Sequence, residues 1–347
     1  MEADGRYIVV LKDDGSTRLK STKAKRDHIH LKATDLLEKH RIGRRLDHTY
    51  ESAIKGFSIK MTQDQAHEIE KDDLVSYVEK DQQTYALCFW KKKPTQISPN
   101  SQTKPWGVSR VGGGQTYNGT NVAWVIDSGI DLTHPDLNVD QSRGVSFVEG
   151  ISSLNDDCGH GTHVAGIIGA KNNTFGTVGV AAGATVIPVK VLDSAGQGLS
   201  SYLLAGINYV AANGKLGDVV NISVGCGVSQ AIDDAVISAS EIVKFSIAAG
   251  NDGKSVSQYS PARVNGANIY IVSAMEEGDT WASYSNFGSD FCAPGSSIFS
   301  TFKGGGYITK SGTSMAAPHV AGLLLLGSMG ADGVVNNNPI AHIGYGR

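Results

Sequence analysis

The stretch 185-TVIPVKVL-192 leads through 200-SSYLLAGINYVAA-212 to 218-DVVNISV-224, which gives a strand pattern, a helix pattern and a second strand pattern in succession. Both strand patterns are apolar on each side, as is typical of parallel strands buried between layers of helices. The alternation continues along the chain, with strand patterns at 122–126, 245–249 and 269–274 and helix patterns at 163–170, 230–242 and 314–326. The sequence therefore predicts an α/β fold, a doubly wound and mostly parallel sheet with helices on both faces.

The first hundred residues have a different composition. They contain 19 basic and 16 acidic residues and only 4 of the 42 glycines, whereas the rest of the chain contains 12 basic and 18 acidic residues. Strand patterns at 7–12, 54–61 and 74–80 alternate with helix patterns at 22–40 and 62–71, which predicts a small α+β domain. The basic, Pro- and Ser-rich segment 91-KKKPTQISPNSQTKP-105 then indicates an exposed linker.

Charge and hydropathy exclude several classes of partner. The formal net charge is −3 and the isoelectric point is near 6.4, so we expect no nucleic-acid partner, and no apolar run is long enough to span a membrane. The N-terminus MEADGRYIVV has neither a basic n-region nor an apolar h-region, so any secretion signal has been removed or never existed. The four cysteines form no C-x-x-C pair, and we expect buried thiols, although disulfides remain possible.

Three segments bracketed by glycines carry candidate catalytic side chains. Asp127 ends a strand pattern, His160 begins a helix pattern, and Ser314 lies between a Gly-Thr pair and an apolar helix pattern. These are the orienting carboxylate, the general base and the nucleophile that acyl transfer needs. Each residue also has an ordinary interpretation, as a turn residue, a structural histidine and a helix N-cap. Because chance seldom brings three such segments together, the catalytic interpretation is favoured.

The chain resembles the subtilisin-like serine proteases, the subtilase family. The matching blocks follow that family's Asp, His, Ser order and are 125-VIDSGIDLTHPDL-137, 159-GHGTHVAG-166, 221-NISVG-225, 247-IAAGN-251 and 312-GTSMAAPHVAG-322. They cover roughly Pro105 to Gly322, and the N-terminal module resembles the family's inhibitory propeptide. The resemblance implies an inhibitor-like propeptide at 1–87, a processing linker at 88–104 and a catalytic domain at 105–347.

The resemblance also implies a function and roles for single residues. The protein would be a serine endopeptidase that hydrolyses extended polypeptides through an acyl-enzyme, made as a self-processing, secreted and monomeric zymogen whose own propeptide inhibits it. Ser314 would attack the scissile carbonyl, His160 would take its proton, and Asp127 would hold the imidazole in the right tautomer. Asn251 would supply the side-chain donor of the oxyanion hole, beside the backbone N–H of Ser314.

By the same resemblance, substrate lies as an extended strand between two backbone segments, Gly196, Gln197 and Gly198 on one side and Ser223, Val224 and Gly225 on the other. Ala248, Ala249 and Gly250 would form one wall of the first side-chain pocket. Leu192, Leu203 and Val224 would line an apolar fourth pocket or would simply be core residues. The length of the family's propeptide places the first cut after Leu87, with later trimming through 91-KKK-93.

A calcium site also follows from the resemblance. The loop 171-KNNTFGTVG-179 matches the family's metal loop, with a side-chain oxygen from Asn173, main-chain oxygens from Lys171, Phe175 and Thr177, and further ligands from Asp136 and Gln102. Oxygen ligands suit a hard cation such as Ca²⁺. From the residues alone the loop is an ordinary Asn- and Gly-rich loop, and His160 with His163 lacks a third ligand for a transition metal.

The chain also departs from the family pattern. It ends 33 residues after Ser314, and 327–347 does not resemble the helix that usually closes the fold, while 88–100 resembles an insertion. Two other functions are considered, a catalytically inactive relative that acts by binding and a non-proteolytic hydrolase with the same triad. No triad or oxyanion residue is missing, which disfavours the first, and the propeptide-like module disfavours the second.

Overall fold

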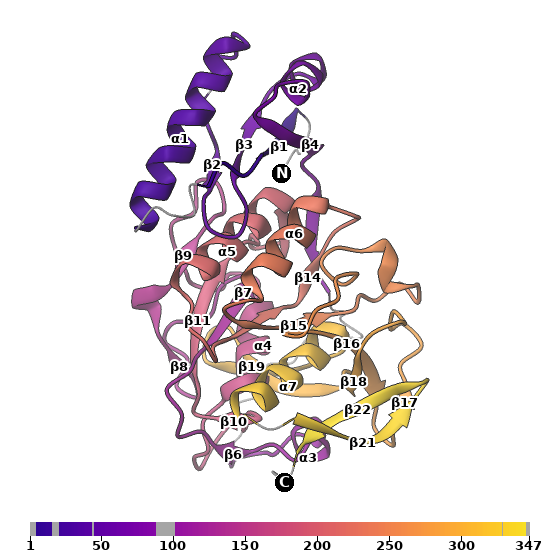
Figure 1. Ribbon diagram of the computed structural model, residues 1–347. Helices are drawn as coiled ribbons and strands as arrows, with labels where there is room; N and C mark the ends of the chain where they lie inside the picture. The colour runs from indigo at the N-terminus through magenta and orange to yellow at the C-terminus, as the bar shows by residue number, and fades with distance from the viewer. Residues whose placement is uncertain (1–4, 16–20, 44, 88–100, 328, 345–347) are drawn as a thin grey trace.

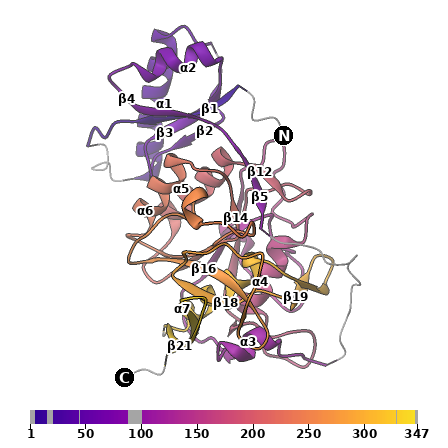
Figure 2. The same ribbon diagram turned by 90° about the vertical axis from the view of Figure 1, so that its right-hand side faces the viewer.

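The computed structural model describes residues 5–15, 21–43, 45–87, 101–327 and 329–344, which form a small N-terminal domain seated on a larger C-terminal one (Figure 1). From the N-terminal domain, the strand β5 (Gln83–Ala86) runs down along the C-terminal domain (Figure 2). Most of the predicted linker, 88–100, lies outside the described residues, and so does Cys88.

The N-terminal domain is a four-stranded antiparallel sheet, ordered β2-β3-β1-β4, with two helices. Thr62 and Gln65 form a reciprocal capping box at the start of the second helix, as its opening residues predict. Buried residues of both helices and three strands form a separate hydrophobic core here, so the predicted α+β domain is present. The elements are β1 (Arg6–Leu11), α1 (Thr22–Lys39), β2 (His48–Tyr50), β3 (Gly56–Lys60), α2 (Gln63–Glu70) and β4 (Val75–Lys80).

The C-terminal domain is built on one long sheet, ordered β21-β22-β18-β16-β15-β13-β7-β11-β8. All neighbours from β22 to β8 are parallel, and β21 pairs antiparallel with β22. The strands are β7 (Ala123–Asp127), β8 (Asn138–Val139), β11 (Thr185–Lys190), β13 (Val219–Ile222), β15 (Lys244–Ala248), β16 (Ile269–Glu276), β18 (Phe291–Pro294), β21 (Met329–Val335) and β22 (Asn338–Ile343).

Helices cover both faces of this sheet (Figure 1), which confirms the predicted fold class. Strand β7 shows how: Trp124 and Ile126 belong to one core cluster with α5 (Ser200–Asn213) and α6 (Gln230–Ala239). Ala123 and Val125 belong to the other, with α4 (His160–Gly169) and α7 (Thr313–Leu325). Because successive strand residues point to opposite faces, a strand buried on both faces must be apolar throughout.

The chain's C-terminal part forms the hairpin β21–β22 at the edge of this sheet, in the region where the sequence shows no closing helix. Its turn is Asn336-Asn337, both with positive φ (47° and 62°), the geometry of a two-residue hairpin turn. Strand β22 pairs with β18 at Cys292 and Ile340, and the two side chains are buried together.

The remaining elements are short. They are α3 (Trp106–Arg110), β6 (Gln115–Thr116), η2 (Gln141–Arg143), β9 (Val145–Ser146), β10 (Ala181–Ala182), β12 (Gln197–Leu199), β14 (Val224–Gly225), η3 (Val256–Gln258), β17 (Thr280–Trp281), β19 (Ile298–Phe302) and β20 (Gly306–Lys310). No helix among the described residues is long and apolar enough to cross a lipid bilayer.

Candidate active site

Asp127 and His160 form a buried pair at the carboxyl edge of the sheet. Asp127 is the last residue of β7 and His160 the first residue of α4, and both side chains are fully buried. Nδ1 of His160 lies 2.7 Å from Oδ1 and 2.9 Å from Oδ2 of Asp127. A carboxylate in this place favours a proton on Nδ1, which makes Nε2 the basic nitrogen of the ring.

Ser314 is the second residue of α7 and does not cap it. The N-cap position belongs to Gly312, and that position makes no side-chain capping bond. The Ser314 hydroxyl donates a hydrogen bond to the carbonyl oxygen of Ser223 at 3.0 Å, and its backbone N–H donates to the carbonyl oxygen of Leu87 at 3.3 Å. The N-terminus of α7 therefore directs its N–H at the carbonyl of Leu87, while the hydroxyl is bonded to the carbonyl of Ser223.

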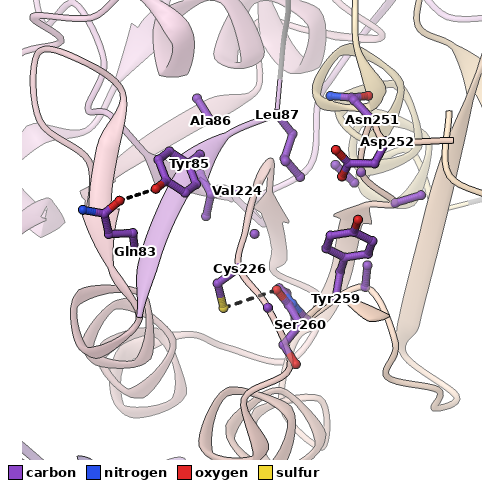
Figure 3. A pocket seen from close by; sticks show the side chains of 17 residues that line it. Gln83, Tyr85, Ala86, Leu87, Val224, Cys226, Asn251, Asp252, Tyr259 and Ser260 are labelled. Atoms are coloured by element: carbon purple, nitrogen blue, oxygen red, sulfur yellow. Dashed lines mark hydrogen bonds between the residues drawn. The ribbon is translucent and has the colours of Figure 1, made fainter. Parts of the chain in front are cut away.

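Asn251 lines the same pocket as Leu87, and Thr313 orients its amide. Its Oδ1 accepts hydrogen bonds from the backbone N–H of Thr313 at 2.9 Å and from the Thr313 hydroxyl at 3.1 Å. Because the oxygen is held by Thr313, the NH₂ group points elsewhere, and in Figure 3 the nitrogen lies on the side of Leu87. The Asn251 amide and the Ser314 N–H therefore both lie near Leu87.

The tail of the N-terminal domain fills the cleft as the middle strand of a three-stranded antiparallel sheet, β12-β5-β14. The backbone N–H of Ala86 donates to Gly196 O and that of Leu87 donates to Ser223 O, both at 3.1 Å. Gly198 faces Thr84, and a Cβ at position 198 would lie 2.2 Å from Val191 O and 2.9 Å from Thr84 Oγ1. A Cβ here would collide with the Val191 carbonyl oxygen and press on the Thr84 side chain, so glycine is required at position 198.

The side chain of Leu87 enters a pocket of about 320 Å³ (Figure 3). The predicted wall residues Ala248, Ala249 and Gly250 line it. Val224, Gly225 and Asn251, which the sequence predicts as site residues, line it as well. The other lining residues were not predicted, since neither the apolar thiol of Cys226 nor the loop that carries Tyr259 has a local signal. The additional lining residues of the C-terminal domain are Cys226, Gly227, Asp252, Tyr259, Ser260, Pro261 and Ala262.

The residues proposed for a fourth pocket are all fully buried. Leu192, Leu203 and Val224 belong to the main core cluster, which is what the core interpretation expects. Leu192 also reaches the cleft, because its Cδ2 lies 3.0 Å from the place that a Cβ of Gly198 would take, next to Thr84. Leu192 is therefore a core residue and also a neighbour of Thr84, the buried residue that is fourth in the tail when counted back from Leu87.

Two acidic residues of the N-terminal domain cap helices of the C-terminal domain, which the sequence analysis did not predict. Asp81, 2% exposed, accepts hydrogen bonds from the hydroxyls of Ser200 and Ser201, both at 2.6 Å, and from Ser201 N–H at 2.9 Å, at the start of α5. Glu79 accepts from Ser229 and from two backbone N–H groups at the start of α6. Negative charge is favourable at a helix N-terminus, although burial raises the pKa of Glu79.

A loop of the N-terminal domain also docks on α5. Oδ1 of Asn208 accepts hydrogen bonds from the backbone N–H groups of Glu51, Ser52 and Ala53, at 3.0, 2.7 and 3.1 Å. Close by, the ring of His48 packs edge-on against Phe147 and Tyr202. The two domains therefore share a polar interface that extends well beyond the cleft.

The predicted calcium ligands lie together at the loop that follows the C-terminal end of α4. Nε2 of Gln102 lies 2.9 Å from Lys171 O, 3.4 Å from Asn173 Oδ1 and 3.3 Å from Thr177 O. Asp136 accepts hydrogen bonds from Asn173 Nδ2 and Thr177 N–H, and burial raises the pKa of its carboxyl group. Within the described part of the chain there is no cluster of three His, Cys, Asp or Glu side chains.

The structure also places His163 and three of the four cysteines. Nε2 of His163 lies 3.1 Å from the carbonyl oxygens of Ile298 and Ile308, and burial lowers its pKa, so this residue is part of the core. Cys158, Cys226 and Cys292 are free thiols. Cys226 and Cys292 are buried as expected, whereas Cys158 is only partly buried and lies near Gly196.

Two family models match parts of the chain. A family model described as the subtilase family matches residues 118–329, and one described as peptidase inhibitor I9 matches residues 6–86. The M-protease of Shouchella clausii is 38% identical over 301 residues, which cover 84% of this chain and 73% of that protein. The extracellular serine proteinase of a Thermus species is 36% identical over 344 residues, covering 93% of this chain and 80% of that protein.

A solved structure is also similar. The crystal structure of a cold-adapted subtilisin-like serine proteinase has a TM-score of 0.57 and 37% sequence identity, and the match covers 64% of this chain and 83% of that one.

Proposed function

Since the chain belongs to the subtilase family of serine endopeptidases and carries an I9 inhibitor propeptide, we propose that Ser314, His160, Asp127 and Asn251 are its catalytic residues. The observation that carries the proposal is the 3.3 Å hydrogen bond from Ser314 N–H to the carbonyl of Leu87, in a tail bound as an extended strand. A carbonyl polarised in this position is where a nucleophile is needed.

In the proposed mechanism the Ser314 hydroxyl turns from Ser223 O toward His160 and adds to the substrate carbonyl carbon while its proton passes to Nε2. Asp127 stabilises the imidazolium through Nδ1–H, and the oxyanion accepts hydrogen bonds from Ser314 N–H and the Asn251 amide. The C–N bond breaks as His160 returns the proton to the leaving amine. Water then hydrolyses the ester by the same steps, with His160 again acting as the base.

We also propose the substrate-binding residues. Gly196, Gln197 and Gly198 with Ser223, Val224 and Gly225 would bind the substrate backbone on its two sides, as they bind β5. Ala248, Ala249 and Gly250 would contact the side chain before the scissile bond. Main-chain bonding of this kind is independent of sequence, so selectivity would come from the pockets.

The first cut would fall after Leu87, making 1–87 the propeptide, 88–104 the linker and 105–347 the catalytic domain. The position of the Leu87 carbonyl supports this bond, and the chain's own triad would cut it. Incubation of the purified zymogen followed by mass determination of the fragments tests the position.

The basic test of function is hydrolysis of a chromogenic peptide with an apolar residue before the cleaved bond. We expect hydrolysis by the processed protein and its loss after treatment with a serine-directed phosphonofluoridate. A processed protein that binds peptides without cleaving them would instead support an inactive, binding relative.

A secreted, monomeric protein is proposed as well. The name of the Thermus relative, an extracellular proteinase, supports secretion, and a cleft occupied by the same chain's tail supports a monomer. Light scattering of the zymogen and of the processed enzyme would test the oligomeric state.

Calcium is proposed as a structural cofactor, held by Gln102, Asp136, Lys171, Asn173, Phe175 and Thr177. Three oxygens already surround the Gln102 amide, and a turned amide would add a fourth, which fits a hard cation. The bound ion would tie the segment around Gln102 to the loop after α4.

Asn173→Ala should therefore lower the melting temperature in calcium and remove most of the calcium response. A ligand that binds only the folded state stabilises it by RT ln(1 + [L]/Kd), about 2.7 kcal/mol at 100 Kd. Thermal unfolding of an inhibitor-blocked enzyme, with calcium or chelator, measures the effect, and Asn138→Ala at an exposed position of the short edge strand β8 is the control. Equal melting temperatures of the wild type in calcium and chelator would exclude the site.

Propeptide affinity should fall below neutral pH because of His48. Burial, and then the charge of Arg6, lower the pKa of His48 from 6.5 to about 4 in the bound state. The bound form therefore prefers the neutral ring. The affinity of the propeptide for the catalytic domain is then highest above pH 6.5 and decreases as the pH falls from 6.5 toward 4. At pH 5.5 the contribution of His48 amounts to about tenfold weaker inhibition.

Inhibition constants of residues 1–87 at pH 7.5 and 5.5 measure this effect, and His48→Gln should remove the tenfold difference. The charge of nearby Glu149 raises the pKa of His48 and so acts against the shift. Burial raises the pKa values of the Glu79 and Asp47 carboxyls, so their contribution to propeptide affinity has the opposite pH dependence to that of His48. These groups are the same in both proteins, so the comparison isolates His48. An equal pH response in wild type and variant would show that the ring makes no such contribution.

A further inference from the structure

Asp156 lies directly behind the catalytic pair and accepts five hydrogen bonds while being 1% exposed. Oδ1 accepts from the Ser128 hydroxyl at 2.8 Å and from Cys158 N–H and Gly159 N–H at 3.1 and 2.7 Å. Oδ2 accepts from Thr162, at 2.8 Å from its N–H and at 2.7 Å from its hydroxyl. One carboxylate thus holds both the segment before His160 and the first turn of the helix that begins with it.

Ser128 connects this carboxylate to Asp127. Its backbone N–H donates to Asp127 Oδ1 at 2.7 Å, and its hydroxyl donates to Asp156 and accepts from Gly161 N–H at 3.0 Å. A chain of hydrogen bonds therefore runs from Asp127 through Ser128 and Asp156 to the start of α4. This chain is a second link between Asp127 and His160, beside their direct contact.

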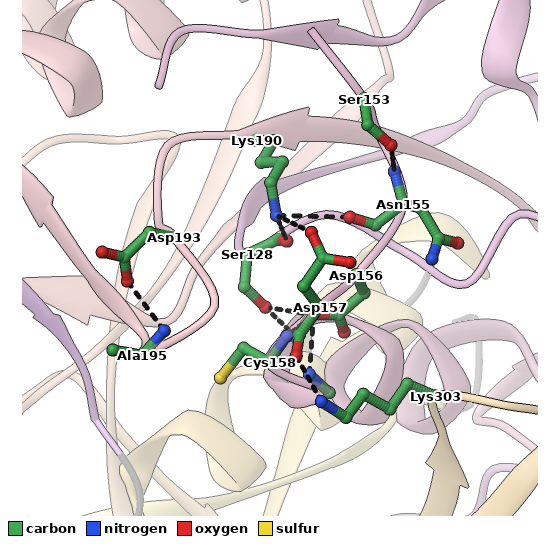
Figure 4. Close-up of polar contacts among 12 residues, drawn as sticks. Ser128, Ser153, Asn155, Asp156, Asp157, Cys158, Lys190, Asp193, Ala195 and Lys303 are labelled. Carbon is green, nitrogen blue, oxygen red and sulfur yellow. Dashed lines mark hydrogen bonds and ion pairs between the residues drawn. The ribbon is translucent and has the colours of Figure 1, made fainter. Parts of the chain in front are cut away.

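The side chain of Lys190 is fully buried. Figure 4 shows its ammonium group pointing toward Ser128 and Asn155. Lys190 pairs with Asp127 across β11 and β7, and its ammonium group donates to Ser128 O at 2.5 Å and to Asn155 O at 3.2 Å. The carboxylate of Asp157 lies 3.8 Å away. A fully buried ammonium group is costly unless its donors are satisfied and opposite charge is near, and this site meets both conditions.

Three other helices of the chain are capped more simply. The N-cap residues Ser21, Thr62 and Ser229 of α1, α2 and α6 each accept a hydrogen bond from their own helix. Helix α4 instead has Gly159 at its N-cap, with φ of +93°, and its cap comes from Asp156 through a buried network. The cap of α4 differs from these because its carboxylate is joined through Ser128 to Asp127, and because a buried lysine donates to the carbonyl oxygen of the same Ser128.

We propose that Asp156, joined to Ser128 and backed by Lys190, is a positioning residue that holds the His160 ring in line with Asp127 and Ser314. The proposal rests on the proposed catalytic role of His160. It adds the claim that the geometry of the Asp127–His160 pair is set by a second carboxylate that does not contact substrate. Since a small displacement of a catalytic base weakens proton transfer, loss of this carboxylate should lower kcat more than it changes KM.

The test compares Asp156→Asn with Asp218→Asn. Asp218 is a matched control at the other end of β7, because it is 2% exposed and accepts hydrogen bonds from Val122 N–H, Trp124 Nε1 and Lys215 N–H, each at 3.1 Å. Both full-length zymogens are expressed and processed, active sites are titrated, and kcat, KM and melting temperature are measured with the same peptide.

We expect Asp156→Asn to lower kcat by 30-fold or more with KM within threefold, and Asp218→Asn to lower the melting temperature with kcat within twofold. Ser128→Ala, which keeps the carboxylates of Asp127 and Asp156, should lower kcat about tenfold. If Asp156→Asn does not fold, this variant tests the positioning role instead. An unchanged kcat in Asp156→Asn, or in Ser128→Ala when that variant decides, would overturn the proposal. Failure of the proposed function would be visible separately, as a wild-type enzyme that does not hydrolyse the peptide.

Discussion

Ser314→Ala is expected to leave the chain at full length and without measurable peptidase activity. Loss of the corresponding nucleophile in subtilisin lowers kcat by about 10⁶-fold, and we expect the same order here. The fold should persist, because the substitution removes one hydrogen bond to Ser223 O, worth about 1 kcal/mol, and leaves the buried backbone unchanged. Gel analysis over time and peptide hydrolysis measure the two outcomes.

Ser246→Ala is the matched control for this experiment. Ser246 is also buried and donates to a backbone carbonyl, that of Ala317 in the same helix, at 2.7 Å. This variant should process itself and hydrolyse peptide as the wild type does. A Ser314→Ala chain that is still cut after Leu87, with other proteases absent, would contradict self-processing.

Asp81→Ala should weaken inhibition by residues 1–87 by about 100-fold or more. The carboxylate is buried, accepts three hydrogen bonds at the start of α5, and would leave the hydroxyls of Ser200 and Ser201 without it. Hydrogen bonds to a charged group contribute about 1.5–3 kcal/mol, and each 1.4 kcal/mol is tenfold in affinity. Asp64→Ala, the same charge change on an exposed position of α2, should change the inhibition constant by less than twofold. Equal inhibition by both variants would show that the helix cap does not control affinity.

Local patterns were sufficient to predict the fold. The strands β7, β11, β13 and β15 are apolar on both faces, and the helices between them bury a wide apolar surface, so the layer order followed from residue types alone. The hairpin β21–β22 was not predicted, although 334-VVNNN-338 carries a turn signal between apolar residues, because a short strand needs its partner β18 to bury it.

The site could be predicted only where its residues lie in short motifs. Asp127, His160 and Ser314 each stand in a distinctive segment, and the structure brings the first two within 2.7 Å. Tyr259 in the pocket, Asn208 under the docked loop and Asp156 behind the histidine have no such signal. Their positions depend on contacts between distant parts of the chain, which no local pattern encodes.

The three-stranded sheet β12-β5-β14 has a consequence for what the processed enzyme can cut. With the tail removed, two short strand edges face each other across a gap one strand wide, and only a segment that can straighten over about five residues fits it. Helices, tight turns and strands already paired within a folded domain must first separate from their own neighbours. The cleavage rate of a folded protein would then depend on how often it opens locally. Segments with a low free energy of local unfolding would be cut fastest.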